Sequence, residues 1–144
     1  MQSPYTYGRH IKADSLEEAV ETVKKSFVES GWGLPEGTTN LDFAKIFSAK
    51  KIDDNFRPSK VLGFCHPSTA HEVLLAEPAS AVLLPCNVVV AMANPGIYQV
   101  ATISPRFMGQ TMQNKEALSD AITSVDNRIL EALNGLPVCE GESW

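Results

Sequence analysis

Three side chains with the chemistry of nucleophiles, bases or metal ligands stand at the ends of two apolar runs. Cys65 and His66 follow the first run, and Cys86 precedes the second. A thiol placed just before a helix that begins at Pro67 lies near free backbone N–H groups and the positive end of the helix dipole, which lowers its pKa. If the two runs are neighbouring strands, both sulfur atoms lie at one end of the sheet. The sequence therefore indicates a candidate site formed by these three side chains.

The two thiols admit a reactive and a structural interpretation. In the reactive one, Cys65 is the sulfur of a thiol-based redox enzyme or sulfur carrier, His66 is its base, and Cys86 is the resolving or supporting thiol. In the structural one, both cysteines are small buried hydrophobic residues, since free cysteine is among the most buried residue types. The interval between Cys65 and Cys86 is far longer than in a thioredoxin-type centre. Both interpretations stay open, so the sequence does not decide whether the chain is an enzyme.

A metal or haem site is a third interpretation. Cys65, His66 and Cys86 supply two soft ligands and one imidazole, but neighbouring residues of a regular strand point to opposite faces. His71 comes five residues after His66, a spacing that excludes a two-histidine zinc helix. Three methionines are further soft ligands, although such residues are more typical of core packing: Met92, Met108 and Met112. These residues assign no cofactor.

Two other catalytic classes lack their motifs. The Gly-x-Ser-x-Gly sequence of α/β-type serine hydrolases does not occur. Gly31-x-Gly33 follows a predicted helix, and it lacks the third glycine and the Lys-Ser or Lys-Thr of a phosphate loop. Nucleotide hydrolysis therefore has no support.

Length, charge and composition are typical of a folded protein that binds neither nucleic acid nor a membrane. With 144 residues, 44% of them hydrophobic and 20% charged, the chain fits one domain with its own core. A net charge of -5 disfavours phosphate backbones, which bind clustered Lys and Arg. No run approaches the roughly 20 apolar residues of a membrane-spanning helix, and Met1 to His10 lack the apolar core of a signal peptide. Three widely spaced cysteines fit reduced thiols, so we expect a cytoplasmic location.

Residue patterns predict a strand and a helix at the start of the chain. Alternating bulky residues over 5–12 predict the strand. Ser15 and Glu18 form a Ser-x-x-Glu capping box for an amphipathic helix that ends at Gly31. A short strand is expected around Trp32 and Leu34.

A turn and a short helix are predicted next. Pro35-Glu36-Gly37 has the composition of a turn. Asn40 or Thr39 is expected to cap the short helix. Its predicted buried side consists of Leu41, Ala44, Ile46 and Phe47.

The middle of the chain predicts strand, helix and hairpin. Val61 to Cys65 is a short apolar run that predicts a buried strand, and Pro67 suits the first position of a helix that Pro78 stops. Asn87 to Met92 is apolar on both faces and predicts a central strand. Asn94-Pro95-Gly96 then predicts a tight turn, after which residues 97–103 return as the antiparallel partner.

The last third predicts a long helix and a tail. Asn114 is expected to cap the helix, which ends at Gly135. Its apolar stripe consists of Leu118, Ala121, Ile122, Val125, Ile129 and Leu133. Its outer face is expected to carry Asp120, Asp126 and Arg128. Residues 136–144 lack periodicity and are expected to form a loosely attached tail. Together the elements predict an α+β fold of two layers, with a mixed or antiparallel sheet and helices packed on one face.

The middle of the chain has an apolar strand that ends in cysteine and is followed by x-Pro. Leu-Leu-Pro-Cys and a Val-rich strand come later. This pattern resembles the bacterial and archaeal family known as domain of unknown function 302. The resemblance rests on Gly63, Cys65, Pro67, Ala70, Leu83, Leu84, Pro85, Cys86, Val88 and Val90. It extends to Gly31-Trp32 after the first helix and to Ser104-Pro105 before the last one. The family usually has Asn after the first cysteine, where this chain has His66.

The resemblance implies a compact α+β domain over residues 5–135, a homodimer, and a cytoplasmic protein that is sometimes fused to other modules. It implies no agreed activity. We therefore expect a binding or accessory module that holds a small molecule or a protein segment near Cys65, His66 and Cys86. The alternatives are the thiol-based enzyme or sulfur carrier and the metal or haem protein.

Overall fold

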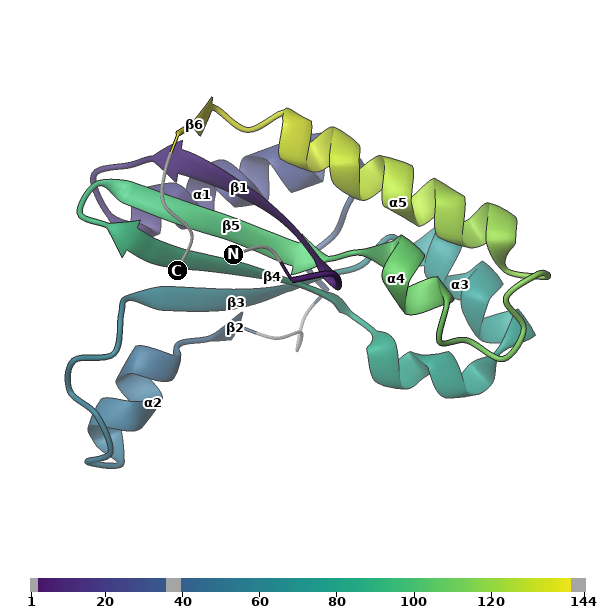
Figure 1. Cartoon of the computed structure of the whole chain (residues 1–144), viewed down its shortest axis with the longest axis horizontal. Helices are drawn as coiled ribbons and strands as arrows, with labels where there is room; N and C mark the ends of the chain where they lie inside the picture. The colour runs from purple at the N-terminus through teal and green to yellow at the C-terminus, as the bar shows by residue number, and fades with distance from the viewer. Residues whose placement is uncertain (1–2, 36–39, 141–144) are drawn as a thin grey trace.

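The computed structural model describes residues 3–35 and 40–140. Within these ranges six strands form one sheet in the order β2-β3-β4-β5-β1-β6, and neighbouring strands are antiparallel (Figure 1). The strands are β1 (Thr6–Lys12), β2 (Asn40–Leu41), β3 (Ser59–Phe64), β4 (Cys86–Asn94), β5 (Ile97–Ile103) and β6 (Val138–Cys139). The helices are α1 (Leu16–Glu29), α2 (Phe43–Ala49), α3 (Pro67–Ala76), the 3-10 helix η1 (Pro78–Leu83), α4 (Pro105–Gly109) and α5 (Ser119–Asn134).

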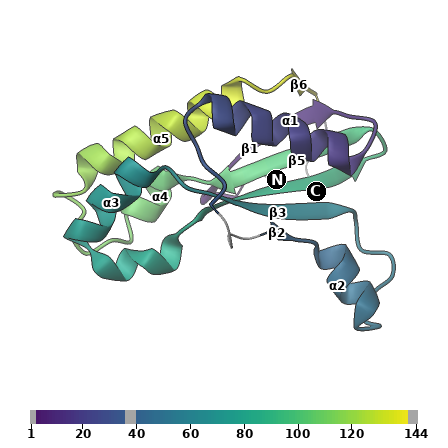
Figure 2. The same cartoon turned by 180° about the vertical axis from the view of Figure 1, so that it is seen from behind.

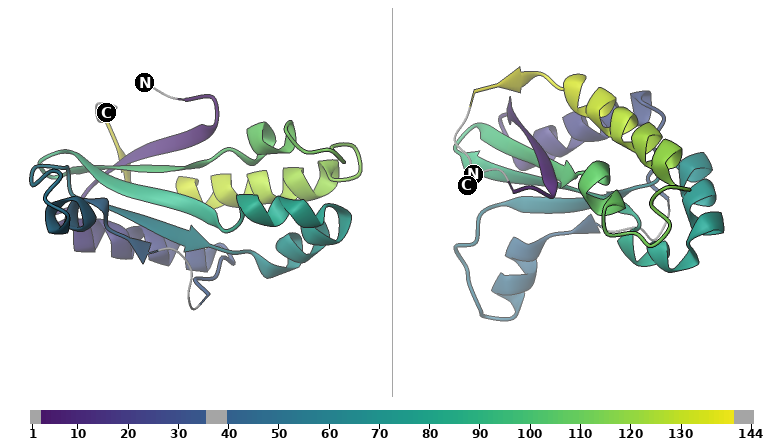
Figure 3. Two further views of the ribbon diagram at one scale, coloured as in Figure 1. Left: turned by 90° about the horizontal axis from the view of Figure 1, so that it is seen from below. Right: turned by 45° about the vertical axis from the view of Figure 1, so that its right-hand side comes forward.

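Helices cover one face of the sheet, as predicted. In Figure 3, α1 runs along one side of the strands, and no helix in the described ranges crosses the opposite side. The apolar side chains of α1 and of the second half of α5 pack on the strands, because their helical stripes face the alternate residues of each strand. The buried strand residues of this main core are Ile11, Leu62, Phe64, Cys86, Val88, Val90, Tyr98 and Val100.

A smaller apolar cluster lies beyond the ends of the strands. It joins α3, the segment around α4 and the first half of α5, and its buried residues are Val73, Met108, Met112, Leu118, Ala121 and Ile122. The α5 helix therefore spans both clusters. Met108 and Met112 are core residues here, as the sequence indicated.

The predicted first helix and the hairpin are confirmed. The Ser15 hydroxyl accepts a hydrogen bond of 3.1 Å from the Glu18 N–H, and the Glu18 carboxylate accepts one of 2.9 Å from the Asp14 N–H. Strands β4 and β5 pair in antiparallel register around Gly96, which has a φ of 80° that suits glycine. These local signals determine the element boundaries in this part of the chain.

The prediction for the second helix was wrong in its cap and its buried side. Asn40 and Leu41 form β2, paired with Leu62 and Val61, and the Asp42 carboxylate caps α2 by accepting a 3.0 Å hydrogen bond from the Lys45 N–H. No residue of α2 is buried, because the helix projects away from the other helices (Figures 1 and 2). Thr39 and the end of the Pro35-Glu36-Gly37 turn lie outside the described residues.

The predicted cap of the last helix was also wrong. Helix α5 begins at Ser119, after turns over residues 113–118. Asn114 instead links this segment to α3, because its N–H donates to the Glu77 carboxylate over 2.9 Å and its side-chain amide donates to the Ala76 carbonyl over 2.9 Å. Asn114, which was expected to cap the last helix, thus makes a tertiary contact with the end of α3 instead.

Asp126 does not lie on the outer face of α5. Its side chain is fully buried and accepts hydrogen bonds from the Tyr7 hydroxyl at 2.7 Å and from Arg106 Nε at 2.8 Å. The pKa of Tyr7 is raised by burial and then by its hydrogen bond to Asp126. The carboxylate therefore joins β1, α4 and α5 through a buried, charge-assisted network.

Part of the expected tail belongs to the sheet. Val138 and Cys139 form β6, which pairs with Ile11 and His10 of β1. A strand of two residues is too short to show an alternating pattern, so no pattern in the sequence indicates it. The prediction of a loosely attached tail is corrected for these residues.

Candidate functional site

The junction between β3 and α3 positions Cys65 and His66. Cys65 follows the last residue of β3 and forms a two-way backbone bridge with Gly33, with N–H to carbonyl distances of 2.9 and 2.8 Å. This single bridge is what the structure has in place of the short strand expected near Trp32. His66 then occupies the N-cap of α3, and Pro67 begins the helix as predicted.

Cys86 comes to the same place from the neighbouring strand. It is the first residue of β4 and lies opposite Phe64, one residue before Cys65. Only 4% of Cys86 is exposed, whereas Cys65 is half-buried. Both remain free thiols. The antiparallel register thus brings the two cysteines to one end of the sheet.

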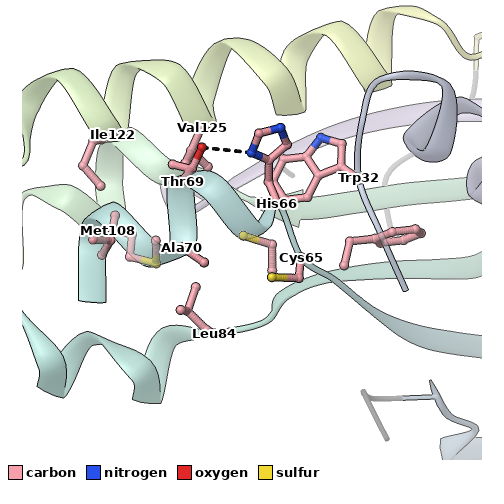
Figure 4. A pocket seen from close by; sticks show the side chains of 12 residues that line it. Trp32, Cys65, His66, Thr69, Ala70, Leu84, Met108, Ile122 and Val125 are labelled. Carbon is pink, nitrogen blue, oxygen red and sulfur yellow. Dashed lines mark hydrogen bonds between the residues drawn. The ribbon is translucent and has the colours of Figure 1, made fainter. Parts of the chain in front are cut away.

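A small apolar pocket lies between this end of the sheet and α3, α4 and α5 (Figure 4). Its volume is about 30 Å³. The lining is Trp32, Phe64, Cys65, His66, Thr69, Ala70, Val73, Leu84, Cys86, Met108, Ile122 and Val125. These residues include members of both apolar clusters, so the pocket lies at the boundary between the two clusters.

His66 lies at one end of this pocket with its hydrogen bonds directed to hydroxyls. Its Nδ1 is 3.0 Å from Thr69 Oγ1 and 3.3 Å from Ser68 Oγ, and its ring meets the edge of Trp32 at a centroid distance of 5.7 Å. Burial, and then the Arg128 guanidinium, lower the pKa of His66. The imidazole is therefore neutral at neutral pH and is held by Thr69 and Ser68.

The predicted lowering of the Cys65 pKa was wrong. Burial raises the pKa of the Cys65 thiol. Burial, and then the neighbouring Cys65, raise the pKa of Cys86 from 9.0 to about 11. Removing a thiolate from water disfavours its charge, and this is the cause of the shift at Cys65 and the larger cause at Cys86. Both sulfurs are therefore protonated at neutral pH, which is the opposite of what a nucleophilic thiol requires.

The three candidate residues do not form a metal centre. Within residues 3–35 and 40–140, no group of three or more His, Cys, Asp and Glu side chains is placed to hold a metal ion. Cys65 and His66 both line the pocket, and the His66 Nδ1 is directed to Thr69 at the start of α3 (Figure 4).

Sequence reasoning missed most of the pocket wall. Trp32, Leu84 and Met108 come from three distant segments, and only the folded chain brings them together. Ile122 and Val125 were assigned to the apolar stripe of the last helix, but the stripe alone does not tell which of its residues border a pocket. The Gly31-Trp32 pair was the one signal for Trp32.

A six-stranded antiparallel sheet with helices on one face, and a pocket where strand ends meet helices, defines a two-layer α+β protein. The family model described as "Domain of unknown function DUF302" matches residues 7–136. The chain belongs to this family.

A solved structure shares the fold. The crystal structure of an uncharacterized conserved protein DUF302 from Bacillus stearothermophilus aligns with a TM-score of 0.80 at 20% sequence identity, over 93% of this chain and 99% of that chain. No curated protein gives a significant match to this sequence. No helix in the described part of the chain has the length and apolar character needed to cross a membrane.

Proposed function

We propose that this protein is a non-enzymatic binding or accessory module whose ligand site is the apolar pocket beside Cys65, His66 and Cys86. The observation that carries the proposal is the pocket itself, whose lining is mostly apolar with His66 and Thr69 as polar groups, the usual character of a small-molecule site. Its two thiols have raised pKa values, so they contribute apolar, polarisable surface and not a thiolate. This pairing of an apolar pocket with protonated thiols favours binding over catalysis.

The size of the pocket sets the size of its ligand. A water molecule needs about 10–15 Å³ of such space, and apolar cavities of this kind stay dry and accept small apolar molecules. The volume of about 30 Å³ therefore suits an apolar group of a few heavy atoms. Butanamide, a neutral molecule with a propyl end, is a matching probe.

Filling the pocket is expected to abolish binding of this probe. Ala70 lines the pocket from α3, so the three extra carbon atoms of Ala70→Leu occupy the space of the propyl group. We expect butanamide to shift the indole NMR signal of Trp32 in the native protein, and to bind at least about tenfold more weakly to the variant. The Trp144→Phe variant assigns the indole signal.

Ala76→Leu is the matched control, because Ala76 is exposed on the same helix. It should bind butanamide like the native protein. Equal binding by Ala70→Leu and Ala76→Leu, or no binding by the native protein of butanamide or of its carboxylate analogue, would refute the proposed site.

We infer that two copies of the chain associate through the α2 arm, which we define as residues 40–58. Figures 1 and 2 show α2 projecting from the body. The arm carries the ring contacts of Phe47 with Phe43 at 5.7 Å and with Phe56 at 4.9 Å, while Ile52 is 71% exposed. An exposed apolar cluster of this kind is typical of an interaction surface.

A groove beside α1 supports a second copy as the partner of the arm. The groove has a volume of about 190 Å³ and is lined by Leu16, Glu17, Val20, Glu21, Lys24, Asn40 and Lys60. Leu16 and Val20 offer apolar surface to the exposed Ile52 of another copy. A two-fold arrangement makes this contact twice.

The Ile52→Glu variant is expected to convert the dimer into a monomer. A charge in the apolar centre of the interface has no partner there, and leaving it buried opposes association. Val82→Glu is the control, because Val82 is 86% exposed on η1 at a distance from the arm. Sedimentation velocity distinguishes the outcomes. A monomeric native protein, or equal dimer fractions in both variants, would contradict the inferred interface.

We infer that the protein works in the cytoplasm. Cys65, Cys86 and Cys139 are all free thiols, and two of them line the pocket. A reducing compartment keeps such thiols free. The free thiols of the pocket therefore agree with a location in the cytoplasm.

A further inference from the structure

Two nitrogen-bearing side chains meet at the rim of the pocket above Gly31. A methyl group placed on Gly31 would lie 3.6 Å from His66 Nε2 and 3.8 Å from Arg128 Nη1. Gly31 is exposed and has a φ of 89°, so the rim reaches solvent at a position that suits glycine. Both nitrogens therefore border one open space beside the pocket.

The fold holds Arg128 and the pocket wall on the same side of α5. Arg128 follows Val125 by three residues, which places the two side chains on neighbouring positions of one helix face. The Trp32 indole N–H donates a 3.4 Å hydrogen bond to the Arg128 carbonyl. Trp32 in turn contacts the His66 ring, as Figure 4 shows. The rim and the apolar wall are thus built from the same contacts.

Arg128 has a charge that the described residues leave uncompensated. The ion pairs in residues 3–35 and 40–140 join Lys24 to Glu21, Lys60 to Asp42 and Arg106 to Asp126. Arg128 takes part in none of them, although its side chain is half-buried. A half-buried guanidinium beside an apolar pocket attracts an anion that can form paired hydrogen bonds with it.

His66 adds a second donor to this rim. Its Nδ1 faces the hydroxyls of Thr69 and Ser68. When these hydroxyls donate to Nδ1, the neutral ring carries its proton on Nε2, the atom that faces the space above Gly31. Arg128 and His66 Nε2 then present N–H groups to the same small region.

We propose that the ligand is a small monocarboxylate, with its carboxylate bound by Arg128 and His66 Nε2 and its short apolar end in the pocket. This inference rests on the proposed function and specifies its ligand class. The volume of about 30 Å³ limits the apolar end to about three carbon atoms. Butanoate fits this description.

Butanoate and butanamide test the proposal because they share size and shape and differ in charge. We expect the native protein to bind butanoate about tenfold more tightly than butanamide, since a hydrogen bond to a charged group is stronger than a neutral one. In Arg128→Gln the two affinities should become nearly equal, with that of butanamide unchanged. Both are measured by titration of the Trp32 indole signal. Lys25→Gln, which removes an exposed charge from α1, should keep the native preference.

The outcomes separate this inference from the proposed function. If both probes bind equally to the native protein and Ala70→Leu weakens both, the pocket is a binding site and the carboxylate assignment is wrong. If neither probe binds, the proposed function fails as well. If Arg128→Gln is poorly folded, the preference of the native protein for butanoate should still weaken as salt is added, and a preference independent of salt would overturn the role of charge.

Discussion

Asp126→Ala is expected to lower the free energy of unfolding by about 1–3 kcal/mol, the range for leaving a buried hydrogen-bonding group without its partner. Asp126 is fully buried and accepts hydrogen bonds from Tyr7 and from Arg106. The variant leaves the Tyr7 hydroxyl without its acceptor and leaves space in the packing beside α5. Urea unfolding followed by circular dichroism measures the change.

Asp120→Ala is the control for this prediction, because Asp120 is exposed in the first turn of the same helix. It should change the free energy of unfolding by less than about 0.5 kcal/mol. Arg106→Ala should also lower the free energy of unfolding, because it leaves the fully buried Asp126 carboxylate without its cation. Similar losses in Asp126→Ala and Asp120→Ala would show that the buried network does not stabilise the fold.

Cys86 is expected to alkylate far more slowly in the native protein than in the unfolded one. Its pKa rises from 9.0 to about 11, mainly through burial, so its thiolate fraction at neutral pH falls about a hundredfold. Its alkylation rate should therefore keep rising about tenfold per pH unit well above pH 9, without reaching a plateau. Burial also raises the pKa of Cys65, so Cys65 should also alkylate more slowly in the native protein than in the unfolded one.

Timed alkylation with mass spectrometry resolves the cysteines separately. The same protein unfolded in urea is the control, since its thiols have ordinary pKa values. The pH profile distinguishes a high pKa from restricted access, because poor access lowers the rate equally at every pH. If Cys65 instead reacted faster in the native protein and reached its plateau below the ordinary pKa of a thiol, the thiol-enzyme hypothesis would replace the binding proposal.

Local patterns were sufficient to predict most of the sheet and its helical layer. Ser15 and Glu18 set the start of α1, Pro67 set the start of α3, and Gly96 set the central hairpin. These signals act over a few residues, so the sequence contains them directly. The central position of β4 followed in the same way, because both of its faces are apolar.

Predictions failed where tertiary contacts overruled local preference. Asp126 has the spacing of an outer residue among charged neighbours, yet Tyr7, more than a hundred positions away, makes its burial favourable. Asn114 is a good helix cap, but Glu77 and the Ala76 carbonyl use its hydrogen-bonding groups. Neither partner can be identified from the spacing of residues along the chain.

The candidate site was predictable in part. The sequence located Cys65, His66 and Cys86 at strand ends, and the structure brings all three to the same pocket. It did not predict the direction of the Cys65 pKa shift, because this shift is caused by burial, and the residues that line the pocket with Cys65 come from distant parts of the chain. The sequence also did not predict that Arg128 lies at the rim, because this depends on how α5 is placed beside Gly31 in the folded chain.

The most direct test of the pocket as a ligand site is a measurement of intermolecular nuclear Overhauser effects between the methyl protons of butanoate and the methyl groups of the native protein. Our account predicts contacts with Ala70, Val125 and Met108, which line the pocket, and their loss in Ala70→Leu. Contacts confined to residues outside the pocket, or contacts that persist unchanged in Ala70→Leu, would contradict it.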